Sequence, residues 1–246
     1  MEVTKVRDLT LIKIDENKTM IIACDSCGGI GVKRGDVLKI EPFFTGKFTA
    51  RVALMEVLCT GAKVVTVVDT ICNEMENTGM EIIKGIKDEL RASGIKGIVL
   101  TGSTEENFKT VSTALGITVV GIVENRDLKV NNIKTNAIVV SVGLPKVGDE
   151  IKLDNDEEIV KYHTIRALLN NPQVYEIVPV GSKGILNEAR QLAKCNEMKW
   201  ICYEKSNIDL IKSAGPSTVV IAAISENALM DIRNIKNLNI IGRLEL

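Results

Sequence analysis

A glycine-rich turn directly follows a short apolar run in the stretch MIIACDSCGGIGVK, residues 20–33. The apolar run is typical of a buried strand, and it ends at an acid, Asp25. The turn supplies three glycines and a lysine, which are Gly28, Gly29, Gly31 and Lys33. Glycines let backbone N–H groups come close to an anion, and carboxylate oxygen is a ligand that Mg²⁺ prefers. The stretch therefore predicts either a site for a nucleotide phosphate with its metal ion or an ordinary surface turn after a strand.

The composition of the 246 residues is that of a globular protein with little overall charge. Lysine and arginine total 31 and aspartate and glutamate total 32, so no basic field favours nucleic acid or anionic lipid. Aromatic residues make up only 3%, which argues against base-stacking platforms for single strands. No apolar run approaches the roughly 20 residues of a membrane span, and the N-terminus is too charged for a signal peptide. We therefore expect a cytoplasmic protein that binds neither nucleic acid nor membrane.

The six cysteines are too sparse for a disulfide scaffold, so we expect them to stay reduced. Cys24 and Cys27 have the C-x-x-C spacing of a redox pair or of half a zinc site. A zinc site needs a second pair of ligands, and Cys59, Cys72 and His163 show no such spacing. Small side chains beside a closely approaching backbone are the favoured interpretation.

The first half of the chain alternates strands and helices around the opening stretch. We expect strands at 9–14, 19–24, 63–69, 98–101 and 117–123, and helices at 46–60 and 77–93. Residues 31–46 are expected to form a loop over the site. Asp69 ends its strand as Asp25 does, and acids at the ends of two strands can converge on one edge of a sheet.

Glu56 is the unusual residue of the expected helix 46–60. It falls on the same side as Ala53 and Thr60, where a carboxylate is costly unless it is paired or binds a metal ion. The alternative is an exposed glutamate or one beside Arg51.

A second candidate turn, GSTEEN at residues 102–107, follows the strand expected at 98–101. Gly102, the hydroxyls of Ser103 and Thr104, and the acid Glu105 make this turn a candidate for phosphate and metal. The alternative is the start of a helix capped by one of the two hydroxyls.

A break in the apolar pattern at 124–136 predicts a domain boundary, with domains at 1–124 and 136–246. The second domain is expected to have strands at 137–142, 175–180, 200–203, 218–224 and 239–244, and helices near 157–169, 182–194, 208–213 and 226–232. Its turn GSKG, residues 181–184, carries Lys183 and opens a helix. This turn either faces an anion or is a plain loop before the helix.

In this order and at these spacings, the motifs resemble those of the aminoimidazole ribonucleotide (AIR) synthetase superfamily, which includes thiamine monophosphate kinase and selenophosphate synthetase. ACDS at 23–26 is similar to the Thr-Asp strand end of that superfamily. MEVLCTGA at 55–62 looks like its helix with Asn-Asp before a Gly-Ala turn, and TGST at 101–104 looks like its Gly-Gly-Asp-Thr turn. Asp69 stands where relatives often have an acid, and Asp8 is similar to an acid that opens the kinase members.

The resemblance implies a two-domain AIR synthase-like fold of the α/β (α+β) class. Its N-terminal domain is expected to pair in a homodimer through a β-barrel and to bind ATP and Mg²⁺, and its C-terminal domain to be a mixed α/β sandwich. The implied metal ligands are Asp25, Asp69, Glu105, Glu56 and Asp8. The implied ATP-binding residues are Gly28, Gly29, Gly31, Gly102, Ser103, Thr104 and Lys183. Lys33 would neutralise charge on the transferred phosphoryl group beside Asp25, the other residue expected to act in catalysis.

Within the superfamily the chain looks most like the α-ribazole kinase branch, on the motifs ACDSCGGIG, TGSTEENF and PVGSKGI. This implies a kinase that phosphorylates the 5′-hydroxyl of α-ribazole, a nucleoside-like small molecule of cobalamin lower-ligand assembly. Glu56 and Ser103 depart from the acids that relatives carry. Three alternatives therefore stay open: a thiamine monophosphate kinase-like phosphorylation, a carboxyl or amide activation, and a non-catalytic nucleotide-binding protein.

Overall fold

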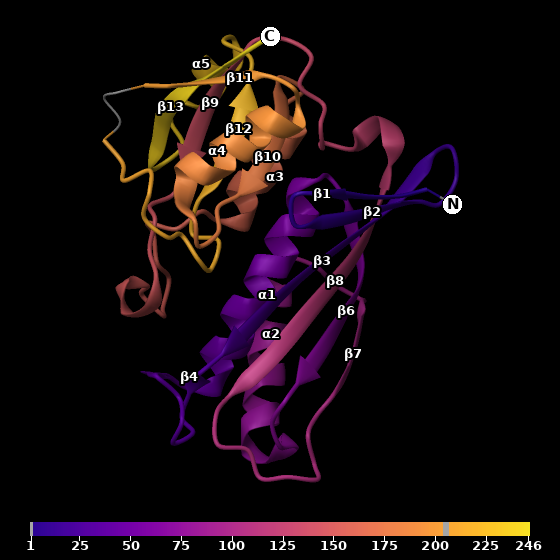
Figure 1. The fold of residues 1–246 in the computed structure, drawn as a ribbon, viewed down its shortest axis with the longest axis vertical. Helices are drawn as coiled ribbons and strands as arrows, with labels where there is room; N and C mark the ends of the chain where they lie inside the picture. Colours follow the sequence, from indigo (N-terminus) through magenta and orange to yellow (C-terminus); the bar gives the residue numbers. More distant parts are fainter. Residues whose placement is uncertain (1, 204–206) are drawn as a thin grey trace. The chain divides into compact units, whose positions relative to one another are not determined.

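The structure is a computed structural model that describes residues 2–203 and 207–246. The chain divides into two compact units (Figure 1), and each of them contains its own sheet. The first unit comprises the residues up to Leu58 together with Ala62–Asn125. The second comprises Cys59–Gly61 and Arg126–Leu246, so the chain finally leaves the first unit after Asn125.

In the described residues, the first unit has one six-stranded sheet in the order β1-β2-β3-β8-β6-β7. All neighbours are antiparallel except β6 and β7, which are parallel. The strands are β1 Val3–Val6, β2 Leu9–Lys13, β3 Lys18–Gly28, β6 Lys63–Ile71, β7 Val99–Ser103 and β8 Ala114–Glu124. The short pair β4 Ile30–Gly31 and β5 Leu38–Lys39 lies apart from this sheet. The helices are α1 Pro42–Cys59 and α2 Met80–Ala92, and the turn η1 Met75–Gly79 leads into α2 with Glu76 in a non-helical conformation.

Side-chain alternation along β8 separates a buried face from an outer face of this sheet. Leu115, Ile117 and Val119 are fully or almost fully buried, and the residues between them are only half-buried. The buried face packs against α1, because a side chain at Gly121 would collide with Val57 of that helix. β8 thus contributes one row of large apolar side chains to the core of the unit.

The two helices of the first unit approach each other closely. A Cβ atom on Gly46 of α1 would collide with the backbone of α2, and a Cβ atom on Gly85 of α2 would collide with the backbone of α1. Only glycine permits this separation at both positions. Arg51 of α1 and Glu89 of α2, both buried, form an ion pair across the same interface at 3.4 Å.

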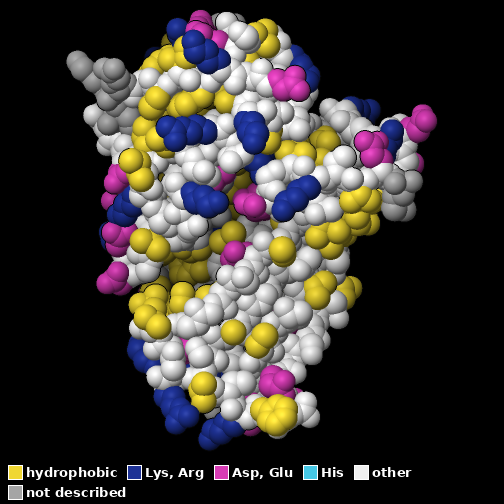
Figure 2. All heavy atoms as spheres, viewed as in Figure 1, with side chains coloured by type: hydrophobic (Ala, Val, Ile, Leu, Met, Phe, Trp, Pro, Cys, Tyr) yellow, Lys and Arg dark blue, Asp and Glu magenta, His cyan; other side chains and the backbone are white. Residues whose placement is uncertain are grey.

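The outer face of the sheet is largely uncharged and only partly shielded from solvent. Ile22 of β3 pairs with Val120 of β8, and Met20 pairs with Ile122, so apolar residues continue across neighbouring strands. In the view of Figures 1 and 2 the strands of the first unit lie in front of its helices, and white and yellow atoms predominate over them. The sheet is open, with β1 and β7 at its edges, and the described residues form no closed barrel.

In the described part of the chain, the second unit contains one five-stranded antiparallel sheet in the order β10-β12-β9-β13-β11. Its strands are β9 Ala137–Val142, β10 Val174–Pro179, β11 Lys199–Cys202, β12 Val220–Ile224 and β13 Leu238–Glu245. Its helices are α3 Tyr162–Asn170, α4 Gly184–Cys195 and α5 Ala228–Ile232, with 3-10 turns η2 Asn125–Asp127 and η3 Gly148–Glu150. Ile185, Ala189 and Leu192 of α4 pack into one core with Val139 and Ile221 of the sheet.

Most strands and helices predicted from the sequence are confirmed, with differences at their ends. β3 and β6 extend further than predicted, because their pairing with β8 continues beyond Asp25 and Asp69. Both acids therefore lie inside strands rather than at strand ends. The strand β1 was not predicted, and the predicted loop at 31–46 contains β5 and the start of α1.

Two helices suggested by the sequence do not form. The segment 208–213 is irregular, because the Asp209 carboxylate accepts the backbone N–H groups of Ile211 and Lys212. The helix considered after Ser103 is absent for the same physical reason: the carboxylate of Glu105 accepts nearby backbone N–H groups.

No helix in residues 2–203 and 207–246 has the length and apolar character that crossing a membrane requires.

Candidate functional site

The two predicted strand acids lie in one row of paired residues across the first sheet. Asp25 of β3 pairs with Ile117 of β8, Ile117 pairs with Asp69 of β6, and Asp69 pairs with Gly102 of β7. Directly paired residues project from the same face of a sheet. Because Ile117 is completely buried, both acids project from the buried face, on either side of it.

Gly102 provides the space that the carboxylate of Asp69 occupies. A Cβ atom at Gly102 would collide with Oδ1 and Cγ of Asp69, so any other residue there would displace the acid. The sequence predicted Gly102 as a phosphate-binding residue, and the structure places it against this carboxylate.

Burial disfavours the ionised form of both carboxylates. Burial is the main cause that raises the pKa of Asp25 to about 6. A hydrogen bond from the backbone of Ser26 lowers this pKa, and the negative charge of Asp8 raises it. Burial likewise raises the pKa of Asp69, and the positive charge of Lys87 opposes that shift. Neither acid forms an ion pair with any described residue. A bound cation would therefore stabilise both.

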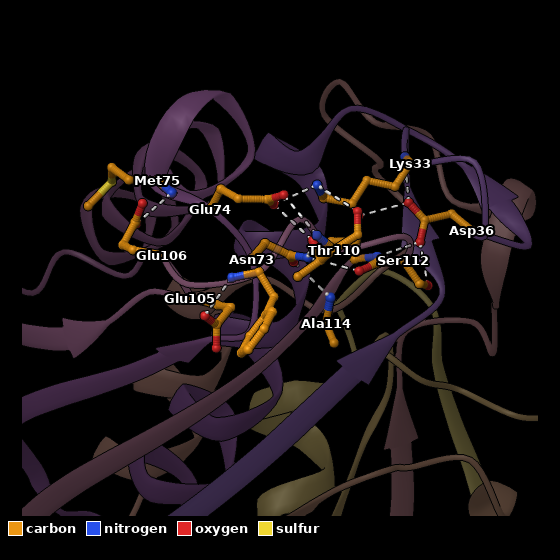
Figure 3. Close-up of polar contacts among 12 residues, drawn as sticks. Lys33, Asp36, Asn73, Glu74, Met75, Glu105, Glu106, Thr110, Ser112 and Ala114 are labelled. Atoms are coloured by element: carbon orange, nitrogen blue, oxygen red, sulfur yellow. Dashed lines mark hydrogen bonds and ion pairs between the residues drawn. The ribbon is translucent and has the colours of Figure 1, made fainter.

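Lys33 lies where three loops meet, at the edge where β3, β6 and β7 all end (Figure 3). Its Nζ donates to Oε2 of Glu74 at 2.7 Å and lies 3.4 Å from the carbonyl oxygen of Thr110. Glu74 also accepts the backbone N–H and the hydroxyl of Thr110, both at 2.8 Å. The hydrogen bond from Lys33 is the main cause that lowers the pKa of Glu74 to about 2. The lysine is thus held by a fully ionised partner.

Asn73 and Asp36 fasten the same loops on either side of this ion pair (Figure 3). The amide nitrogen of Asn73 donates to the Thr110 hydroxyl at 2.7 Å, and its amide oxygen accepts the backbone N–H of Ala114 at 2.9 Å. Asp36 accepts the hydroxyls of Ser112 and Thr113 and the backbone N–H groups of Thr113 and Lys33. Although burial raises it, these hydrogen bonds hold the pKa of Asp36 below its usual value.

An open pocket of about 460 Å³ lies at the same end of the sheet. Residues 70–72 line it at the end of β6, residues 103–105 line it at the end of β7, and Phe108 and Thr110 complete it. Three predicted residues, Ser103, Thr104 and Glu105, therefore share one pocket with Thr110, which links it to the Lys33–Glu74 pair. Thr70 and Ser103 are paired and project from the face opposite to Asp69.

The remaining predicted residues of the first unit are more dispersed. Gly28 and Gly29 have almost no neighbours at the position of a Cβ atom, whereas Gly31 lies against Asp36 and the hydroxyl of Thr113. Asp8 is exposed in the turn between β1 and β2, and Glu56 is half-buried on α1. Arg51, considered as a neighbour of Glu56, forms an ion pair with Glu89 of α2.

Lys183 belongs to the second unit, exposed at the position before α4. The turn that carries it closes through a hydrogen bond from the backbone N–H of Gly184 to the carbonyl oxygen of Gly181.

The C-x-x-C spacing produces no cysteine pair, because Cys24 and Cys27 lie three residues apart in a strand and so project from opposite faces of β3. In the described residues, no group of three or more histidine, cysteine or acidic side chains is already arranged around a metal position. Mg²⁺ commonly binds through only one or two carboxylates, with substrate phosphates and water as further ligands.

Sequence reasoning missed Asp36, Asn73, Glu74 and Thr110. Apart from the backbone N–H of Lys33, which lies three residues from Asp36, the hydrogen-bond partners described above lie between 36 and 77 residues away in the sequence, so spacing does not reveal them. The only available signal was position: Asn73 and Glu74 come just after a strand that is rich in β-branched residues.

Comparison with known proteins identifies the class of the first unit. Residues 6–123 match the family model of the AIR synthase related protein, N-terminal domain. This similarity covers most of the first unit and just under half of the chain. Comparison with curated protein sequences gives no match.

Solved structures that are similar over most of this chain share its mixed α/β fold. The chain is similar to PurL of T. maritima complexed with ATP, with a TM-score of 0.69 and 16% identity over 96% of this chain. It spans only 42% of that PurL chain. AaThiL complexed with AMPPCP and TMP gives a TM-score of 0.69 at 12% identity, over 98% of this chain and 86% of AaThiL. A chain of the HypE–HypF complex gives 0.68 at 14% identity, over 96% of this chain and 86% of that one.

Proposed function

We propose that this protein is an ATP- and Mg²⁺-dependent phosphotransferase that acts on a small molecule. The observation that carries the proposal is the row formed by Asp25, Ile117 and Asp69. It presents two carboxylates on one face, both with a raised pKa and without an ion pair among the described residues. Such a pair suits a hard divalent cation that arrives with a phosphate chain.

The similar structures support a nucleotide as the other substrate. PurL was solved with ATP, and AaThiL with AMPPCP and TMP. AaThiL is the more informative of the two, since this chain spans 86% of its length and only 42% of PurL.

The residues present fit Mg²⁺ and phosphate in the following roles. Asp25 and Asp69 would hold the metal ion, which supplies charge neutralisation when bound. Gly28 and Gly29 leave their backbone N–H groups open to an anion. Lys33, which joins Glu74 and Thr110 of the two neighbouring loops, supplies a positive charge. Phosphoryl transfer depends mainly on positioning and charge stabilisation. The carboxylates, backbone N–H groups and lysine named here are the types of group that provide both. We assign Glu105 to the pocket rather than to the metal, because its Oε1 atom already accepts two backbone N–H groups.

The acceptor we favour is α-ribazole, phosphorylated on its 5′-hydroxyl during cobalamin lower-ligand assembly. The motifs ACDSCGGIG and TGSTEENF, which carry the resemblance to that kinase branch, supply Asp25 and the residues of the pocket. A thiamine monophosphate kinase-like phosphorylation is the second candidate, favoured by the similarity to AaThiL with its bound TMP.

We further propose that the protein is a homodimer that buries the outer face of the first sheet. That face presents half-buried apolar residues, including Ile22 and Val120, without a helix over it in the first unit. A second copy applied to it would cover these residues and complete a barrel from two open sheets.

The test is ADP release in the presence of Mg²⁺ and ATP, with α-ribazole and thiamine monophosphate as parallel acceptors. Wild type is compared with Asp25→Asn and with Asp15→Asn, a control on the exposed turn between β2 and β3. We expect acceptor-dependent ADP release that is lost in Asp25→Asn and retained in Asp15→Asn.

Two results would overturn the kinase assignment. One is ATP binding by calorimetry without turnover on either acceptor, which favours a non-catalytic nucleotide-binding protein. The other is turnover whose product carries no phosphate on a hydroxyl, which favours carboxyl or amide activation.

A further inference from the structure

The pocket at the end of β6 and β7 has a lining that is unsuited to phosphate. Among the described residues that line it, none is a lysine or an arginine, and one of them, Glu105, is an acid. Phosphate groups would be repelled there, whereas an uncharged part of a ligand would not. Its volume of about 460 Å³ falls in the range of small-molecule sites.

The polar groups of the pocket are hydroxyls and one free carboxylate oxygen. Within the part of the chain that the structure describes, the hydroxyl of Ser103 has no hydrogen-bond partner. The Oε1 atom of Glu105 accepts the backbone N–H groups of Asn107 and Phe108, at 2.6 and 3.2 Å, and its Oε2 atom accepts none from the described residues. The acceptor oxygen of Glu105 and the hydroxyl of Ser103 lie two residues apart in the chain. Together they can form hydrogen bonds with the vicinal hydroxyls of a sugar.

Phe108 gives the pocket an aromatic surface in solvent. Its side chain is 77% exposed, although a large apolar ring gains most by burial. The backbone of Phe108 is held at Glu105 by the hydrogen bond above, so the ring stays attached to the turn that carries the pocket acid. Aromatic rings in such positions stack on flat heterocycles, which have a π-face of their own.

We propose that this pocket binds the nucleoside part of a ligand, with its heterocyclic base stacked on Phe108 and its ribose hydroxyls at Glu105 and Ser103. Thr110 closes the pocket on the side of Lys33, whose Nζ lies 3.4 Å from the Thr110 carbonyl oxygen. In this proposal the 5′ end of the ribose lies on the side of Lys33. The inference rests on the proposed function for its choice of nucleosides, which are the adenosine of ATP and α-ribazole.

The experiment measures the Kd of adenosine and of α-ribazole by calorimetry, separately, for wild type and variants of the full chain. Phe108→Ala is expected to raise the Kd of the nucleoside that occupies the pocket roughly five- to hundredfold, as loss of one base–aromatic stack does. Phe108→Trp is expected to keep it near wild type. Glu105→Gln and Ser103→Ala are expected to weaken binding of the riboside but not of its free base.

Val111→Ala is the matched control, because Val111 is 51% exposed on the same segment and does not line the pocket. Binding of inorganic tripolyphosphate is the second control, and Phe108→Ala should leave it unchanged. The nucleoside whose affinity depends on Phe108 identifies the occupant as the nucleotide or the acceptor.

If Phe108→Ala binds both nucleosides as tightly as wild type does, the inference is overturned. This holds even if ADP release supports the kinase proposal. Conversely, Phe108-dependent nucleoside binding in a protein that never releases ADP would sustain the inference and reject the kinase.

Discussion

Asp25 and Asp69 project from the same face of one sheet, with Ile117 between them in a single row. Neighbouring strands are about 4.8 Å apart, so the two acids are separated by roughly 10 Å between their backbones. Two desolvated carboxylates at this separation destabilise the protein when both are ionised and no cation is present. Several measurements can detect this cost and its relief.

Asp25→Asn should stabilise the protein at neutral pH while it abolishes activity. The folded pKa of Asp25 is about 6, above the ~3.9 of an unfolded chain. Its contribution to stability is therefore fully present below about pH 4 and is lost as the pH rises through 6. After allowance for partial exposure, we expect urea denaturation to show a gain of about 1–2 kcal/mol for the variant at pH 7.5 and none at pH 4.

A variant that is less stable than wild type at pH 7.5 would contradict this account of Asp25. Asp8→Asn is the companion test, because removing the charge of Asp8 should lower the pKa of Asp25. Titration of the Asp25 carboxyl by NMR in the two proteins measures that shift directly.

Gly102→Ala should destabilise the first unit, because the new methyl group collides with the carboxylate of Asp69. Forced repacking of this kind costs about 1–3 kcal/mol, which urea denaturation followed by circular dichroism can resolve. Gly28→Ala is the control, since no atom lies within 4 Å of a Cβ at that position. Equal losses in both variants would show that Asp69 is not what restricts residue 102.

Lys33→Met should lower the turnover number about 10²- to 10³-fold, as expected when one fixed charge beside a transferred phosphoryl group is removed. Glu74→Gln should have a smaller effect of about tenfold, because the lysine keeps its charge and loses only the partner that orients it. Initial rates of ADP release measure both. A Lys33→Met protein with wild-type turnover would remove Lys33 from the site.

The buried ion pair between Arg51 and Glu89 should make α1 and α2 sensitive to single substitutions. Glu89→Gln removes the negative charge that pairs with the buried Arg51, and we expect a loss of about 3–5 kcal/mol in the free energy of unfolding. The double variant Arg51→Met with Glu89→Leu should recover most of that loss, since it removes both charges. Additive losses in the double variant would reject the pair as a coupled unit.

Val120→Asp should convert the proposed dimer into a monomer, because it places a charge in the centre of the outer sheet face. Light scattering after gel filtration measures the mass. Lys96→Asp, at an exposed residue in the loop before β7, is the control and should remain dimeric. A monomeric wild-type protein would refute the proposed dimer, and the proposed activity would not depend on that result.

Sequence patterns could predict the elements of this fold but not the contacts between its loops. Runs of apolar and β-branched residues predicted β8 and β6, and with them the strand that carries Asp69. The extension of β3 past Asp25 depends on pairing with a strand about ninety residues later, which no local pattern reports. The same holds for Lys33 and Glu74, whose ion pair joins two loops that are irregular in sequence. For Gly102 the pattern indicated an open backbone, whereas its physical role is to leave room for a neighbouring carboxylate.

The position of β8 has a consequence for the growing chain. β8 is the last strand of the first unit to be synthesised, and yet it separates β3 from β6 at the centre of the sheet. Before residues 114–124 leave the ribosome, β3 and β6 have no common partner, and their acids cannot be brought into register. A nascent chain that stops before residue 114 would therefore expose two unpaired strand edges and carry no metal position. The proposed site therefore depends on this one strand, because β8 pairs with both β3 and β6.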